Sequence, residues 1–200
     1  MRTTLALLLG LLSLAPASAE TLTQGERDRA LSLLHATRKQ FLDSIAGLSD
    51  AQWKFKPAPD VWSIAECAEH IALAEDMLLA VIPKLMQTPA EPQKRAETQG
   101  RDEMLIKGYV DRSHKAQAPE MLVPTHRWPT QAALVDHFKE SRERTLDYIR
   151  TTQDDLRNHF TQHPVFKIVD AYQFILMMAA HTERHTAQLN EVKHNPSYPK

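Results

Sequence analysis

Apolar residues recur at three- and four-residue spacing in four long segments of this chain, and this repeat constrains the fold more than any other feature. The segments cover about residues 25–46, 63–83, 131–156 and 169–193. Glycine occurs only five times, whereas the good helix formers Ala, Leu, Glu, Gln, Lys and Arg are abundant. We therefore predict an all-α protein in which four amphipathic helices bury their apolar stripes against one another as a four-helix bundle.

The segment that begins at Ser63 has the clearest start. Ser63 and Glu66 match the S-x-x-E capping box, in which each side chain accepts a hydrogen bond from the backbone N–H of the other residue. The apolar stripe continues to Pro83 or slightly beyond, and His70 lies within it. A histidine at this position is expected to face the interior of the bundle.

The other helices have less distinct ends. Gly47 is expected to end the first helix, and Thr130 is a favourable N-cap for the third, whose stripe is interrupted by Ser141 and Arg142. The fourth helix is expected to begin near Val169. Because Ser, Thr or Asp would be favoured as a cap there, this start is predicted to be poorly capped.

Residues 87–129 form a long crossover between the second and third helices. This stretch contains five prolines and many charged residues, and a short helix is expected only at about residues 102–113. Connections of this length are usually functional or mobile. The crossover is therefore a candidate lid over the mouth of the bundle.

The N-terminus has the features of a signal peptide. Arg2 provides a positive start, residues 5–14 are an apolar run, and residues 17–19 are small, as at a cleavage site. The apolar run is well short of the roughly 20 residues that a membrane-spanning helix requires. We expect residues 1–19 to be removed, and residues 20–200 to form one exported domain, periplasmic or extracellular, without a membrane anchor.

Charge and cysteine content exclude further classes. The formal net charge is −1, whereas a nucleic-acid-binding domain would carry a clustered basic face. We therefore expect no nucleic-acid partner. Cys67 is the single cysteine, so it cannot form an intramolecular disulfide, and stability must come from packing with a metal as a further contributor.

Two H-x-x-x-H pairs occur among the ten histidines, so the spacing alone identifies no site. His159 and His163 lie at an expected helix end, directly before a proline. His181 and His185 instead occupy the apolar stripe of the fourth helix. Residues i and i+4 of a helix share a face, with Cβ atoms about 5–6 Å apart, which suits two imidazoles that bind one ion.

Burying two histidines without partners is costly, because each ring carries a donor and an acceptor. Hydrogen bonds to acids such as Glu183 or Glu66 are one way to satisfy them. For a single inward histidine we would prefer that explanation. With His181 and His185 in register and His70 inward on another helix, we favour a metal site.

Two segments are similar to a known family. W-S-I-A-E-C-A-E-H-I at residues 62–71 and H-T-E-R-H-T-A-Q-L at residues 181–189 resemble the DinB-like superfamily of bacterial four-helix bundles, as do residues 111–124 and 163–164. The resemblance covers nearly all of the chain after the signal peptide. Two positions depart from it, since Lys167 and Val169 stand where many members have a glycine and a cap residue.

The resemblance implies that His70, His181 and His185 bind one divalent metal ion. Three imidazoles leave an open coordination position, as in catalytic zinc sites. Imidazole suits Zn, Ni, Cu and Fe, and we expect Zn or Ni before Fe or Cu. Family members often dimerise, so a homodimer is an expectation as well.

Such an ion can acidify a bound water or activate a thiolate. The resemblance implies either metal-dependent hydrolysis or thiol-dependent transfer or isomerisation. Thiol cofactors are scarce in an oxidising compartment, so export favours a hydrolase of unknown substrate. The alternatives are a non-catalytic bundle that binds a metal or small ligand, and a thiol-dependent S-transferase or isomerase.

Other side chains have weaker claims to a role. Cys67 could be a fourth ligand, but a small core residue is the better interpretation. Glu69 is expected to face solvent. Glu183 is expected to be solvated or to contact a ligating histidine without binding the metal itself. Arg142 could meet an anionic substrate or reach the surface. His114, His126 and His137 are expected to be solvated.

Overall fold

The computed structural model describes residues 21–114 and 117–200, so the expected signal peptide lies outside the described residues. Its long helices are α1 (Gln24–Ile45), α3 (Ile64–Met86), α6 (Gln131–Thr151) and α7 (Ala171–Lys193). The connections contain α2 (Asp50–Lys54), η1 (Pro92–Lys94), α4 (Arg95–Thr98), α5 (Asp102–Val110), η2 (Glu120–Leu122), β1 (Phe160–His163) and β2 (Lys167–Asp170), where η denotes a 3-10 helix.

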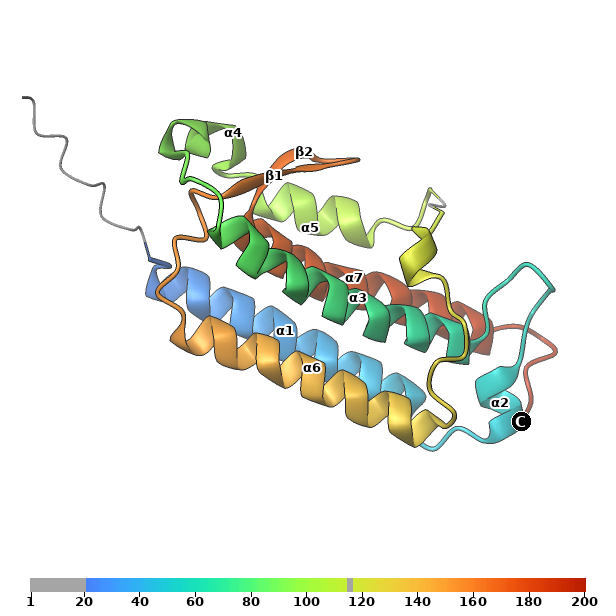
Figure 1. Cartoon of the computed structure of the whole chain (residues 1–200). Coiled ribbons are helices and arrows are strands. Elements are labelled where there is room, and N and C mark those ends of the chain that lie inside the picture. The colour runs from blue at the N-terminus through green and yellow to red at the C-terminus, as the bar shows by residue number, and fades with distance from the viewer. Residues whose placement is uncertain (1–20, 115–116) are drawn as a thin grey trace, which may run out of the picture.

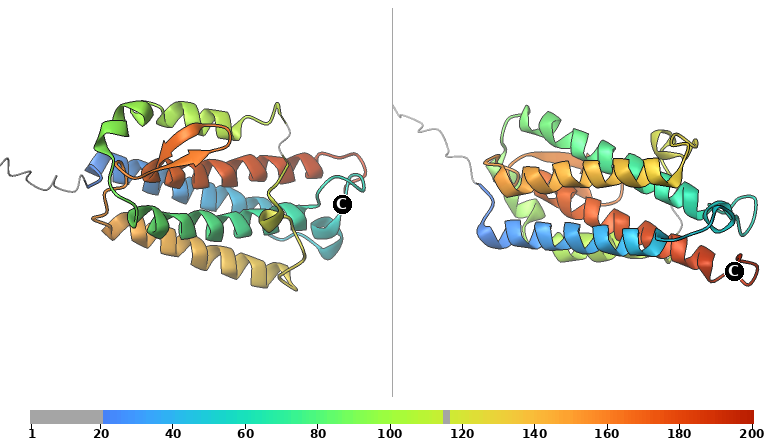
Figure 2. Two further views of the ribbon diagram at one scale, coloured as in Figure 1. Left: turned by 45° about the horizontal axis from the view of Figure 1, so that its top comes forward. Right: turned by 90° about the horizontal axis from the view of Figure 1, so that it is seen from below.

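The four long helices pack side by side as a bundle (Figure 1). Both α6 and α7 pack against α1 and α3, and α1 and α7 run in the direction opposite to α3 and α6. Helix α5 lies against α7 on the outside of the bundle, and the β1–β2 hairpin lies beside α5 (Figure 2). These observations confirm the predicted four-helix bundle with a long crossover between its second and third long helices.

No helix in the described part of the chain combines the length and the apolarity needed to cross a membrane. The apolar residues instead meet inside the bundle. The larger core cluster joins α7 to one end of α1, α3 and α6, and a second cluster fills the other end around Phe41, Ile71 and Phe138. Both clusters draw on the predicted stripes, which explains why the four helices associate.

Local capping fixes the starts of the helices. Ser63 and Glu66 form the predicted capping box at α3, and Thr23 and Glu26 form another at α1. The hydroxyl of Thr130 accepts a hydrogen bond from Ala133 N at the start of α6, as predicted. Each interaction satisfies backbone N–H groups that the first turn of a helix leaves free.

The start of α7 differs from the prediction. Val169 is in β2, which pairs with β1 in an antiparallel hairpin, and the helix begins two residues later. Asp170 is its N-cap and forms a capping box with Gln173, so the predicted poor cap was wrong. Lys167, where the family often has glycine, opens β2 in a left-handed conformation with a φ of 64°.

Helix α6 ends at Thr151, five residues before the predicted end at Leu156. The hydroxyl of Thr152 accepts a hydrogen bond from the backbone N–H of Asp154, a local bond that competes with helix continuation. Leu156 is nevertheless fully buried in the larger core cluster. Its apolar character therefore reflects packing beyond the helix.

An ion pair also lies in the interior of the bundle. Arg142 on α6 is fully buried and donates to both carboxylate oxygens of Glu75 on α3, with 2.8 Å from Nε to Oε2. Nη1 also donates to the carbonyl oxygen of Leu34 and the hydroxyl of Thr37, and Nη2 donates to the hydroxyl of Thr182 as well as to Glu75. Neither predicted role of Arg142 holds, because a residue that ties all four long helices together meets neither substrate nor solvent.

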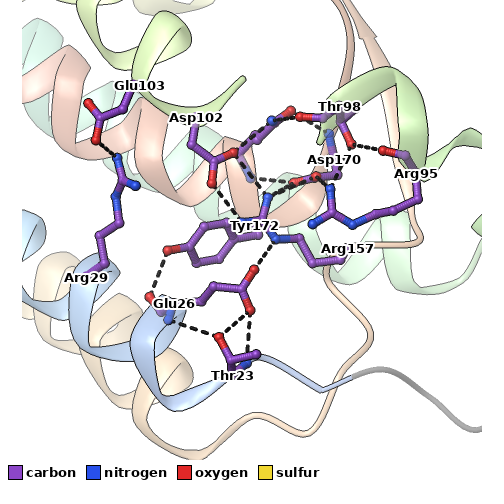
Figure 3. Close-up of polar contacts among 11 residues, drawn as sticks. Thr23, Glu26, Arg29, Arg95, Thr98, Asp102, Glu103, Arg157, Asp170 and Tyr172 are labelled. Carbon is purple, nitrogen blue, oxygen red and sulfur yellow. Dashed lines mark hydrogen bonds and ion pairs between the residues drawn. The ribbon is translucent and has the colours of Figure 1, made fainter. Parts of the chain in front are cut away.

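A second polar network closes the end of the bundle where α1 begins (Figure 3). Arg157 bonds to the carboxylates of Glu26, Asp102 and Asp170, at 2.6, 2.7 and 3.1 Å. Its guanidinium lies 4.0 Å from the ring centroid of Tyr172. The network connects α1, α5 and the start of α7, and thereby holds α5 against the bundle.

Candidate metal centre

Three histidines from two helices converge in the bundle. His70 comes from the second turn of α3, and His181 and His185 come from one face of α7. One ring nitrogen of each lies within 4.8 Å of the others, and the Nε2 atoms of His70 and His181 are 3.1 Å apart. Tetrahedral zinc with Zn–N bonds of about 2.0–2.1 Å places its ligand nitrogens roughly 3.3 Å apart, so the cluster is close to that size.

Hydrogen bonds orient two of these rings. The Nδ1 atom of His70 lies 2.8 Å from the carbonyl oxygen of Leu122, and because a carbonyl only accepts, Nδ1 carries the proton. The Nδ1 atom of His185 lies 2.8 Å from Oε1 of Gln188, which also accepts from Arg112. In both rings Nε2 is therefore left with a free lone pair, the form that binds a metal.

The environment keeps all three rings neutral. Burial lowers the pKa of His70, and it lowers the pKa of His181 further, with the neighbouring histidines adding to the effect. Burial, followed by the proximity of His70, lowers the pKa of His185 to about 3. Neutral imidazole is the ligand form, so protons compete weakly with a metal at this site near neutral pH.

Aromatic rings lie next to two of the histidines. The ring of Trp62, which precedes α3, lies 5.0 Å from that of His70 between centroids. The ring of Tyr109 on α5 lies 6.0 Å from that of His181 and stacks on Phe166. The site therefore has aromatic as well as polar neighbours.

Helix α5 is held over this region by an arginine of α7. Arg184 donates to the carbonyl oxygens of Tyr109, Asp111 and His114, at the end of α5 and in the segment after it. Arg112 forms a two-pronged ion pair with Glu191 of α7, with 2.6 and 2.7 Å between the paired atoms. Residues 109–114 of the crossover are thus attached to α7 close to His181 and His185.

The part of the chain that carries the three histidines matches a known protein family. A family model for the DinB superfamily matches residues 33–189, a span that includes all three histidines. The chain belongs to the DinB superfamily. This confirms the resemblance found in the sequence.

Two individual proteins are similar as well. YuaE from Bacillus subtilis (strain 168), an uncharacterised protein, is 25% identical over 163 residues, which is 82% of this chain and 96% of YuaE. The solved structure of YfiT from Bacillus subtilis has a TM-score of 0.56 and 12% identity, and covers 90% of this chain and 93% of YfiT. YfiT is described as a probable metal-dependent hydrolase with an unusual four-helix bundle topology. At this identity the likeness shows a shared fold.

The remaining candidate ligands lie elsewhere in this DinB-superfamily chain. Cys67 is fully buried in the apolar core, as preferred from the sequence, and burial raises the pKa of its thiol to about 12. Among the described residues, His70, His181 and His185 form the one group of three with metal-ligand spacing. Neither Cys67 nor a carboxylate belongs to it.

The second H-x-x-x-H pair is not on a helix. His159 is buried beside Leu85, whose carbonyl oxygen lies 2.9 Å from Nδ1, and His163 ends strand β1. His114 and His126 are exposed as expected, whereas Nε2 of His137 lies 2.6 Å from a carboxylate oxygen of Asp76. His181 and His185 therefore differ from His159 and His163 in lying on one face of a helix, and not in their spacing.

The prediction for Glu69 was wrong. Its side chain is 3% exposed and accepts hydrogen bonds from three backbone N–H groups of residues 125–127. The sequence shows Glu69 only as a charge next to the apolar stripe of α3. Its partners lie in the crossover, more than fifty residues away, and no local pattern indicates them.

Proposed function

We propose that this chain binds one divalent metal ion through Nε2 of His70, His181 and His185. The observation that carries the proposal is the convergence of three neutral, buried imidazoles from two helices, two of them oriented by hydrogen bonds at Nδ1. The Nε2 atoms of His70 and His181 lie 3.1 Å apart, a separation close to that of two imidazole ligands of one zinc ion. Zinc and nickel are the ions we favour, with iron and copper as alternatives, since imidazole suits all four.

We further propose that the site is a metal-dependent hydrolase of a small substrate. When bound, the ion would supply Lewis acidity at its open coordination position. The residues of the chain hold and orient the ligand nitrogens, and the rings of Trp62 and Tyr109 lie next to two of the histidines. YfiT, which shares the fold and is described as a probable metal-dependent hydrolase, supports this choice.

Export of the protein is part of the same proposal. The charge, apolar run and small residues of positions 1–19 support cleavage before Glu20 and a periplasmic or extracellular location. An oxidising compartment favours hydrolysis over thiol transfer. N-terminal sequencing of protein recovered from a periplasmic fraction should begin at Glu20, and an intact Met1 in the cytosol would contradict export.

Metal analysis tests the proposal most directly. The mature protein should be stripped with a chelator, incubated with an equimolar mixture of Zn and Ni, desalted and analysed for metal content. We expect about one ion per chain in the wild type and far less in His181→Ala, since three ligands are needed for tight binding. His35→Ala is the matched control, because His35 is exposed on α1, and it should retain the ion.

The outcomes separate the candidate functions. A wild-type protein that holds no first-row metal under these conditions contradicts the metal site. If the ion is present, cobalt substitution followed by azide titration reports whether a coordination position is open. An ion that azide leaves unchanged, with no turnover of esters or amides, identifies a non-catalytic metal-binding bundle.

A further inference from the structure

Glu69 and His70 are neighbours on α3, and both bind the end of the crossover. The carboxylate of Glu69 accepts hydrogen bonds from the backbone N–H groups of Thr125, His126 and Arg127, at 2.8, 2.9 and 3.1 Å. His126 has a φ of 59°, so this turn directs successive N–H groups toward one point. Such a concave arrangement of N–H groups is suited to an anion, and Glu69 fills it.

The same segment of the crossover carries the partner of His70. The carbonyl oxygen of Leu122 lies 2.8 Å from Nδ1 of His70. The Leu122 side chain is buried against Leu73 and Ala74 on the next turn of α3. Residues 122–127 are thus attached to α3 at three places, and the Glu69 carboxylate provides the one that does not involve Leu122.

From these contacts we infer that Glu69 is a positioning residue for the metal site. It holds residues 125–127 on α3, which keeps the Leu122 carbonyl at His70 Nδ1 and directs His70 Nε2 toward His181. The expected effect of Glu69 on metal affinity rests on the proposed function. Its expected effect on the tautomer of the His70 ring does not, because the Leu122 contact is present in the metal-free protein.

Glu66 provides a matched comparison on the same helix. It lies one turn earlier, caps α3 through Ser63 and forms an ion pair with Lys56, and it makes no hydrogen bond to the described residues of the crossover. Replacing Glu66 by Gln preserves a capping side chain. Glu66→Gln therefore changes the charge near the site as Glu69→Gln does, without releasing residues 125–127.

The test compares wild type, Glu69→Gln and Glu66→Gln. Nitrogen NMR of the histidine rings in the metal-free proteins should show His70 as the Nδ1–H tautomer in wild type and Glu66→Gln, and as a mixture in Glu69→Gln. Zinc affinity, measured by competition with a chromophoric chelator, should fall by about tenfold or more in Glu69→Gln only, since outer contacts of ligating histidines typically affect affinity by 10–100-fold.

A Glu69→Gln protein with the wild-type His70 tautomer and wild-type zinc affinity would overturn the inference. Amide exchange in the wild type needs no variant, and provides the test if Glu69→Gln does not fold. Protected amides at residues 125–127 support the inference, and exchange as fast as in a free loop overturns it. If wild-type protein binds no zinc, the proposed function fails, while the tautomer comparison still decides the role of Glu69.

Discussion

Replacing Arg157 by Met should strongly destabilise the protein. The side chain of Arg157 is 7% exposed, and its guanidinium is the shared partner of Glu26, Asp102 and Asp170 (Figure 3). Methionine has a similar length but offers neither a donor nor the cation that lies over the Tyr172 ring. The three carboxylates then lose their shared cation, and the fully buried Asp170 is left with Arg95 at 3.7 Å.

The size of the effect follows from burial. Removing one partner of a buried ion pair costs about 3–5 kcal/mol, because the remaining charge stays desolvated. Urea unfolding followed by circular dichroism at neutral pH should show this loss, a large share of the roughly 5–15 kcal/mol typical of a whole domain. Arg29→Met is the control, since Arg29 and Glu103 form a more exposed pair, and such pairs contribute about 1 kcal/mol or less.

The loss should also depend on pH. Burial alone would raise the pKa of Glu26 and Asp102, but hydrogen bonds from Thr23 and Arg157 to Glu26, and from Arg157 and Gln173 to Asp102, lower both pKa values below their ordinary 4.5 and 3.8. Stability from these groups is present above those values and is lost as pH falls through the lowered ones.

The difference in unfolding free energy between wild type and Arg157→Met should therefore narrow below about pH 4.5. Burial raises the pKa of Asp170, so protonation of this one carboxylate partly offsets the stability that the wild type loses at low pH. A difference that stays below about 1 kcal/mol at neutral pH, or that widens in acid, would refute the reasoning, because either result means that Arg157 does not stabilise these carboxylates.

Three further predictions concern single contacts. Lys167→Gly should raise the free energy of unfolding by about 0.5–1 kcal/mol, because glycine adopts the φ of 64° without strain. Urea unfolding measures this difference, and a loss of stability would contradict the prediction. Arg142→Met should cost about 3–5 kcal/mol, and Arg142→Met/Glu75→Met should recover much of it; an additive double variant would contradict the coupling. Gln188→Leu removes the acceptor of His185 Nδ1 and should weaken zinc binding by about 10–100-fold. Competition with a chelator measures the affinity, and an unchanged value would contradict the role of Gln188 in orienting the His185 ring.

The helices could be predicted from the sequence because their signals are local. The stripe and capping box that begin α3 at Ser63 lie within a few turns, and the structure confirms both. The β1–β2 hairpin was missed because its four-residue strands carry little periodic signal. Its last residue, Asp170, serves at once as strand end and helix cap, so a helix was predicted to begin too early.

The candidate site was found for a similar reason. His181 and His185 share a face of one helix, and His70 lies in the stripe of another, so the bundle itself brings them together. What the sequence did not indicate are the contacts supplied by the crossover. Glu66 and Glu69 look alike along α3, and only the distant turn at residues 125–127 distinguishes a buried carboxylate from a capping one.

The orientation of α7 depends on polar contacts as much as on its apolar stripe. Thr182, next to His181, donates to the buried Glu75 of α3 and accepts from Arg142 of α6. A helix rotated by one residue turns by about 100°, which would break both bonds in the core and carry His181 away from His70. Because unpaired buried polar groups are costly, these bonds select the one rotation that brings His181 and His185 to His70. The ion pair at Arg142, which the sequence presented as an interruption of a stripe, thus helps to set the geometry of the candidate metal centre.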